Sequence, residues 1–241
     1  MKTVRILFPS PPRNGRIPGS RMNCPASATS SSVVPVILRY TPPTVQIPPT
    51  IPVMLLSGCC LMPHGMLPLF IFEPRYREML RHAIKSERIF CVAARKPFAE
   101  GEDDNVIEEF TTAGMIRACV HHDDGTSHLM LQGIQRIRLT GWVQREPFRI
   151  ANIEPVLTTV SAPAELTQLR AALLERACSL LTGPRAVENA AKTASIQCNE
   201  VLADFVASNF ISDPVQRQTL LGLADLNERL RCLSDLLAPA G

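Results

Sequence analysis

Short apolar runs separated by turn residues begin at about residue 53. The runs at 53–56 and 67–72 have the length of β-strands, and Gly58, Pro63 and Gly65 lie between them. The same pattern predicts further strands at 88–94, at 106–121 with a bend at Gly114, and at 127–133, 135–143 and 147–156. Many short strands at close spacing favour a small closed or semi-closed barrel.

One helix is predicted among these strands. Proline suits a first helical position, so the helix is expected to begin at Glu73-Pro74. Its apolar face consists of Tyr76, Met79, Leu80, Ala83 and Ile84. Farther along the chain, residues 99–105 (AEGEDDN) predict a polar loop between two strands.

The last third of the chain has the apolar periodicity of helices. A first stripe consists of Leu166, Leu169, Leu173, Ala177, Leu180 and Leu181 and ends at Gly183-Pro184. A second consists of Val201, Leu202, Phe205, Val206 and Phe210. Asp213-Pro214 predicts the start of a short third helix, and Asp225 with Glu228 predicts a capping box before Leu226, Leu230, Leu233 and Leu237. The whole pattern predicts an α+β chain, with a β-domain at 51–157 and a helical bundle at 158–241.

Residues 1–50 have a different composition. The first 52 residues hold 11 of the 21 prolines and six basic residues but no acidic residue. Proline at this density removes backbone donors and blocks helices, so a disordered or extended segment is expected. It is a true tail, an extension from a misassigned start codon, or a targeting segment. The prolines oppose an amphipathic targeting helix, and no apolar stretch is long enough for a secretion signal, which favours the first two.

Charge is unevenly distributed between the two parts. The whole chain has a net charge of +3, but residues 53–241 carry 19 basic and 22 acidic groups, a balance of −3. A slightly acidic folded part lacks the positive footprint that nucleic acids or anionic lipids require. No apolar run reaches the roughly 18 to 20 residues of a membrane-spanning helix. Neither a nucleic acid nor a membrane is therefore expected as a partner.

Eight cysteines are present, and none forms a C-x-x-C pair. They are Cys24, Cys59, Cys60, Cys91, Cys119, Cys178, Cys198 and Cys232. Their positions in apolar runs favour small buried side chains over a metal site or a disulfide framework. Cys59 and Cys60 would lie on opposite faces of an extended segment. Reduced cysteines indicate a cytoplasmic protein.

The short motifs of common catalytic sites are absent from the sequence. It contains no G-x-x-x-x-G-K-[ST], G-x-G-x-x-G, H-E-x-x-H or G-x-S-x-G. A protein that is not an enzyme and has no cofactor is therefore expected. The sequence assigns no catalytic, cofactor-binding or metal-binding residue, and it leaves the binding residues unknown.

Three polar clusters are candidate sites. His121, His122 and His128 flank the predicted hairpin turn Asp123-Asp124-Gly125. A solvated hairpin tip is favoured over a metal site, because adjacent strand residues point to opposite faces. The acidic residues Glu102, Asp103, Asp104, Glu108 and Glu109 favour a solvated loop.

The third cluster is Glu73, Arg75, Tyr76 and Arg77. A structural role is favoured for these residues, with Glu73 at the positive end of the helix and the Tyr76 ring packed inward. The two arginines are expected to pair with nearby acids.

Several segments together resemble a known family. They are 52–80, which contains LPLFIFEPRY at 67–76, then 88–92 (RIFCV), Gly114-Met115-Ile116, 131–139 (LQGIQRIRL) and 147–154 (PFRIANIE). Over residues 51–237 the chain resembles the N-terminal substrate-binding domain of Lon proteases. One departure is Pro63-His64-Gly65, where that family usually has Pro-Gly. The resemblance implies a PUA-like β-barrel followed by helices.

The resemblance also implies a function. In Lon proteases this domain helps to capture unfolded or tagged proteins for an attached AAA+ motor and Ser-Lys peptidase, and no motif of either is found here. The leading hypothesis is a non-catalytic protein-binding module that binds client polypeptides, or docks to a protease, through an apolar groove between barrel and helices. The alternatives are an RNA-binding PUA-like module and an unrecognised hydrolase. The oligomeric state is left open.

Overall fold

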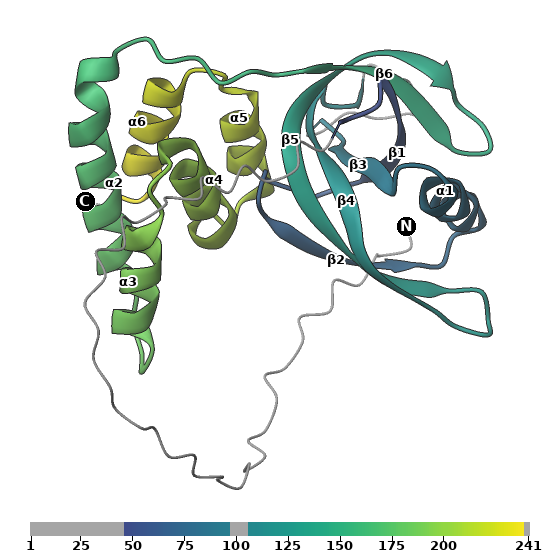
Figure 1. Ribbon diagram of the computed structural model, residues 1–241, viewed down its shortest axis with the longest axis horizontal. Helices are drawn as coiled ribbons and strands as arrows, with labels where there is room; N and C mark the ends of the chain where they lie inside the picture. The colour runs from purple at the N-terminus through teal and green to yellow at the C-terminus, as the bar shows by residue number, and fades with distance from the viewer. Residues whose placement is uncertain (1–45, 97–105, 239–241) are drawn as a thin grey trace, which may run out of the picture. The chain divides into compact units, whose positions relative to one another are not determined.

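The structure is a computed structural model of the chain, and it describes residues 46–96 and 106–238 (Figure 1). Six strands and six α-helices lie in this part, within one compact unit. The strands are β1 (Thr50–Leu56), β2 (Met66–Ile71), β3 (Ile89–Ala94), β4 (Phe110–His121), β5 (Ser127–Gln144) and β6 (Arg149–Pro155). The helices are α1 (Pro74–Lys85), α2 (Leu166–Ser179), α3 (Ala186–Ser195), α4 (Asn199–Phe210), α5 (Pro214–Gly222) and α6 (Leu226–Leu236). The α+β class predicted from the sequence is confirmed.

The six strands form one mixed sheet in the order β2-β5-β4-β3-β1-β6. Strand β6 also pairs with β5, so hydrogen-bonded pairs follow a circuit from β5 through β4, β3, β1 and β6 back to β5. The pairs are antiparallel except for β1 with β3. The long strand β5 holds β2 along 127–132 and β6 along 137–144. Among the described strands, β2 therefore pairs only with β5.

Two strand predictions were wrong. The strand expected at 106–121 begins only at Phe110. The expected strands at 127–133 and 135–143 are the single strand β5, because Gly133 continues the strand instead of breaking it. The bend expected at Gly114 is confirmed as a register shift between Ala113 and Gly114. A side chain at Gly114 would come within 2.6 Å of Leu131, so glycine lets the two strands pack closely at this shift.

The helix predictions were mostly confirmed. The carboxylates of Asp213 and Asp225 accept hydrogen bonds from the backbone N–H groups of Val215 and Glu228, as N-caps do. The first predicted apolar stripe, which ran to Leu181, was too long, because α2 ends at Ser179 and Leu180 is 50% exposed. Helix α3 was not predicted at all. Its sequence, AVENAAKTAS, has no stripe of large apolar residues, and its buried residue is Thr193.

Most of the buried apolar side chains belong to one of two clusters. The first is the sheet core, where strand residues pack with Tyr76, Met79, Leu80 and Ala83 of α1. The second is the helix core, formed by α2, α4, α5 and α6. Cys59 lies in the sheet core, whereas its neighbour Cys60 lies in the helix core. The expected opposite orientation of the two cysteines is thereby confirmed, and the loop 57–65 contributes to both cores.

This loop lies directly against β5 at Gly133. The His64 N–H donates to the Gly133 carbonyl at 2.9 Å, and the Gly133 N–H donates to the Gly65 carbonyl at 2.9 Å. A Cβ atom at Gly133 would lie 2.2 Å from the Met62 carbonyl oxygen, which is closer than any real contact. On the other side of the loop, a Cβ at Gly65 would lie 3.0 Å from Ser208 Oγ of α4. Glycine at 133 is therefore a requirement of this backbone contact.

A buried ion cluster joins the sheet to the helices. Arg136 of β5 donates two hydrogen bonds to the Asp204 carboxylate of α4, at 3.0 and 2.5 Å. Arg229 of α6 lies 3.6 Å from the same carboxylate and donates to the Leu223 carbonyl. Burial, and then the nearby Arg136 charge, lower the pKa of Arg229 to about 10. Because breaking one partner of a buried pair costs about 3–5 kcal/mol, this cluster strongly favours one relative position of β5, α4 and α6.

We expect Gly133→Ala to destabilise the protein by about 2 kcal/mol or more, because the added methyl group meets a backbone oxygen that cannot rotate away. Gly141→Ala is the matched control on the same strand, since its Cβ would meet nothing closer than Asn152 Nδ2 at 3.8 Å. The free energy of unfolding from urea titration measures both. Equal stability of the two variants would contradict the close loop–strand contact.

Candidate functional site

The outward side of β2, β5 and β4 carries an exposed apolar surface, which we call the outer face. Along each strand, inward residues such as Leu67, Leu69 and Ile71 enter the sheet core, and the alternate residues point outward. The outward residues are Met66, Pro68, Phe70 and Phe72 in and after β2, His128 and Met130 in β5, and Ala118 and Val120 in β4. Met66 is 51% exposed and Val120 59%. An apolar surface of this kind on a folded domain indicates an interaction site.

Strand register places the outward residues in rows across the three strands. Phe70 lies opposite His128, which lies opposite Val120 on β4. Pro68, Met130 and Ala118 form the next row. Cross-strand neighbours in such rows are close enough for their side chains to touch, so the outer face is continuous across the three strands.

Four aromatic side-chain rings lie next to one another along this face. The Phe70 ring lies 5.8 Å from Phe72 and 4.6 Å from His128 between centroids. His128 Nδ1 lies 2.8 Å from His122 Nε2, and those two rings are 5.0 Å apart in an edge-on arrangement. Aromatic rings provide large contact area at little cost in side-chain entropy, which suits them to binding extended apolar ligands.

The three histidines considered as metal ligands do not converge on one point. His122 and His128 form the pair just described, whereas His121 Nδ1 lies 2.8 Å from Ser127 Oγ. Among residues 46–96 and 106–238, no group of three or more His, Cys, Asp or Glu side chains is placed to hold a metal ion. The hairpin turn itself is confirmed, with Gly125 at a φ of +79°. The histidines therefore belong to the outer face and its tip.

The structural reading of the residues around Glu73 is confirmed for three of the four. Glu73 and Arg75 form an ion pair at 2.9 Å. The Tyr76 ring is buried, and its hydroxyl contacts both the N–H and the carbonyl of Leu55 at 3.2 Å. Burial raises the pKa of the Tyr76 hydroxyl, so it stays protonated at neutral pH. Arg77 lies beside the hairpin turn, where its guanidinium would be 2.8 Å from a Cβ at Gly125.

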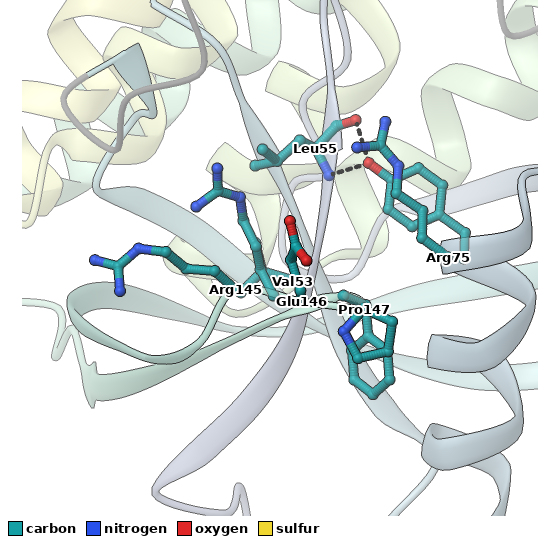
Figure 2. A pocket seen from close by; sticks show the side chains of 9 residues that line it. Val53, Leu55, Arg75, Arg145, Glu146 and Pro147 are labelled. Atoms are coloured by element: carbon teal, nitrogen blue, oxygen red, sulfur yellow. Dashed lines mark hydrogen bonds between the residues drawn. The ribbon is translucent and has the colours of Figure 1, made fainter.

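A pocket of about 340 Å³ lies beside Tyr76 (Figure 2). It opens where the pairing of β1 with β6 ends at Val53 and Arg149. Its walls come from β1, from the first turn of α1 and from residues 145–149. In Figure 2, Arg75 and Arg145 lie on either side of Glu146, and Pro147 lies below Leu55. No residue of this pocket was singled out from the sequence apart from Arg75 and Tyr76.

The expected groove between sheet and helices is not where this pocket lies. At the described contacts between the two groups, Arg136 and Asp204 are buried, and Gln218 of α5 donates to the Phe110 carbonyl of β4 at 2.7 Å. The pocket residues all come from the sheet side, between 53 and 149. Of the acidic patch, Glu108 and Glu109 are described, whereas Glu102, Asp103 and Asp104 lie outside the described residues.

The described cysteines have free thiols. Burial raises the pKa of Cys59 to about 11 and that of Cys60 to about 12, and it raises the pKa of Cys91 further. These thiols are therefore protonated at neutral pH and poorly nucleophilic. The expectation of buried cysteines was wrong for Cys198, which is exposed before α4; Cys24 lies outside the described residues.

The described helices include none that is both long and apolar enough to cross a bilayer.

Comparisons with known proteins agree on one family. The family model of the ATP-dependent protease La (LON) substrate-binding domain matches residues 50–238. The chain is 27% identical to Lon protease 2 of Herpetosiphon aurantiacus over 191 residues and 27% identical to the Lon protease of Dictyoglomus thermophilum over 192 residues. Each alignment covers 78% of this chain but only 23% and 24% of those proteins, respectively. The chain thus spans about a quarter of the length of these relatives.

Solved structures show the same fold. The N-terminal domain of Mycobacterium avium complex Lon protease superposes with a TM-score of 0.65 at 19% identity, over 78% of this chain and 97% of that one. A Lon N-terminal domain protein from Xanthomonas campestris gives a TM-score of 0.53 at 20% identity, over 76% and 95%. Both similarities cover nearly the whole of the solved domain.

We expect Cys59 and Cys60 to react with iodoacetamide at pH 8 about a hundredfold more slowly than Cys198, because a pKa raised by two units or more depletes the thiolate by that factor. Mass spectrometry of the labelled peptides measures each site separately. Labelling in urea is the control, since all cysteines should then react alike. Rapid labelling of Cys59 or Cys60 in the folded protein would contradict the burial of the loop 57–65.

Proposed function

Because the chain belongs to the family of ATP-dependent protease La (LON) substrate-binding domains, we propose that it binds segments of client polypeptides in a non-native, extended state. The observation that carries the proposal is the outer face of β2, β5 and β4. Unfolded polypeptides differ from folded ones in exposing apolar side chains, and this face offers them a complementary apolar surface.

The strength expected of such an interaction suits capture and release. Burying one apolar side chain contributes about 1.5–3 kcal/mol, so a segment that places three or four side chains on the face gains about 5–12 kcal/mol before ordering costs. After those costs, a dissociation constant on the order of micromolar is expected. Binding of this kind is reversible and tolerant of sequence, as a general client-binding module requires.

The edge of β2 that pairs with no other described strand provides a second means of binding. An edge strand presents backbone N–H and C=O groups that can pair with an added extended segment. Pro68 lies within β2 and has no N–H to donate. It therefore limits how long an added strand can grow, which favours short, reversible pairing over aggregation.

The proposed role includes no chemistry of its own. The match covers the substrate-binding domain of much longer proteases, whose remaining three quarters have no counterpart in this alignment. We infer that the chain acts without ATPase or peptidase activity. A separate AAA+ protease is the partner that would act on delivered clients.

The proposal includes three further predictions made from the sequence. They are the PUA-like β-barrel at 51–157, the helical bundle at 158–241, and a cytoplasmic location consistent with free thiols. The circuit of strand pairs supports the barrel, and the separate helix core supports the bundle. The RNA-binding alternative gains no support from the comparisons.

We expect Val120→Asp to weaken binding to a permanently unfolded client, reduced and carboxymethylated α-lactalbumin, by about tenfold, since a bound client would bury the new charge where it had made an apolar contact with the exposed Val120. Fluorescence anisotropy of the labelled client measures the affinity. Val187→Asp is the matched control, because Val187 is 85% exposed on α3, away from the strands.

Two results would reject the proposal. One is equal binding by the Val120→Asp and Val187→Asp variants. The other is binding of native α-lactalbumin as tightly as its unfolded form by the unmodified protein, since the face would then not select for unfolded chains.

A further inference from the structure

The pocket beside Tyr76 is formed by a break in strand pairing. Strand β1 pairs with β6 only from Thr50 to Val53, and residues 145–148 then turn away from it. The backbone groups of Leu55, which no longer face a strand on this side, are taken up by the Tyr76 hydroxyl. The buried Tyr76 therefore lies at the gap between β1 and the β5–β6 turn, and the exposed turn residues Arg145, Glu146 and Pro147 form the outer wall of the pocket.

Positive charge predominates at this pocket. Arg75, Arg145 and Arg149 line it together with one carboxylate, that of Glu146. Glu73, which does not line the pocket, forms an ion pair with Arg75 at 2.9 Å. A guanidinium has five N–H donors, so a group that already has a partner within the chain can still bind an added anion.

Two of the three pocket arginines stack on aromatic rings. The Arg149 guanidinium lies 5.0 Å from the centroid of the Trp142 ring, and the Arg75 guanidinium lies 4.8 Å from that of Tyr76. Stacking on an aromatic ring restricts a long side chain before any ligand arrives. Less side-chain entropy is then lost when an anion binds.

The size of the pocket limits what it can hold. Pockets for small molecules occupy about 300–1,000 Å³, so 340 Å³ is at the lower end and suits one side chain or one chain end. Val53, Pro147 and Phe148 supply apolar walls next to the arginines. A short aliphatic group that ends in a carboxylate matches this combination. Glu146 disfavours a dianion such as phosphate, because it adds like charge.

We propose that this pocket binds a carboxylate of a polypeptide, either an acidic side chain or a free C-terminus. The choice of a polypeptide rests on the proposed function, whereas the choice of a carboxylate rests on the pocket. The pocket would then add a charge preference to clients that bind the outer face. Planar bidentate pairing with arginine provides that preference, since a neutral amide cannot reproduce it.

The test is an NMR titration of the ¹⁵N-labelled full chain with three peptides and one ion. Acetyl-Ala-Glu-Ala-amide presents a side-chain carboxylate, and acetyl-Ala-Ala-Ala presents a free C-terminus. Acetyl-Ala-Gln-Ala-amide presents neither, and inorganic phosphate tests for a general anion site. We expect saturable shifts of pocket amides with one or both carboxylate peptides, and at least about tenfold weaker binding of the neutral peptide.

Arginine substitutions show whether the carboxylate peptides bind in the pocket. Arg145→Gln and Arg149→Gln should each weaken carboxylate binding by about fivefold or more. Arg81→Gln, which removes an exposed arginine of α1 that does not line the pocket, should leave carboxylate binding unchanged.

Equal binding of the neutral peptide, tighter binding of phosphate, or equal losses in all three variants would overturn the proposal. The peptides carry no large apolar residue, so Val120→Asp should not affect them. Loss of carboxylate binding with intact client binding would then reject this inference alone.

Discussion

The contact between the loop 57–65 and β5 at Gly133 is the constraint on which most of the structure depends. Two backbone hydrogen bonds fix the loop to the strand, and there is no room for a side chain between them. The loop then places Cys59 in the sheet core, places Cys60 and Met62 in the helix core, and starts β2 at Met66. The buried Arg136–Asp204 pair lies three residues farther along β5 and joins the same strand to α4. Contacts of the single strand β5 thus determine the positions of both the helices and the outer face.

Much of this fold could be predicted from the sequence because its signals are local. Alternating apolar positions gave the strands, and Asp213 and Asp225 marked helix starts by a cap that acts within three residues. The separate strands expected at 127–133 and 135–143 were wrong because the role of Gly133 within β5 is not local. A glycine within a strand pattern indicates a break unless a distant backbone approaches it, and that approach appears only in three dimensions. Helix α3 was missed because it buries so little, which leaves no stripe to detect.

The outer face and the pocket also depend on contacts between residues far apart in the sequence. Cross-strand rows such as Phe70–His128–Val120 depend on register, which a sequence alone does not supply, so the outer face could not be assembled beforehand. The pocket joins residues almost 100 positions apart and was likewise hidden. Each lies partly on segments that carry the family resemblance: β2 of the outer face falls largely within 67–76, and the pocket takes Arg75, Tyr76 and residues 147–149 from 67–76 and 147–154. The proposed binding of unfolded segments to the outer face and of one carboxylate to the pocket would together form a module that recognises polypeptides by general properties instead of a fixed sequence.

The central claim is that unfolded polypeptide binds the outer face. Hydrogen–deuterium exchange of the full chain, with and without saturating reduced and carboxymethylated α-lactalbumin, tests it most directly. Backbone amides report protection where a client covers them or pairs with them. The account predicts slower exchange in β2 and in the hairpin of β4 and β5 around 118–130, with α2 and α3 unchanged. Protection confined to the helices, or none at a client concentration that saturates binding, would contradict it.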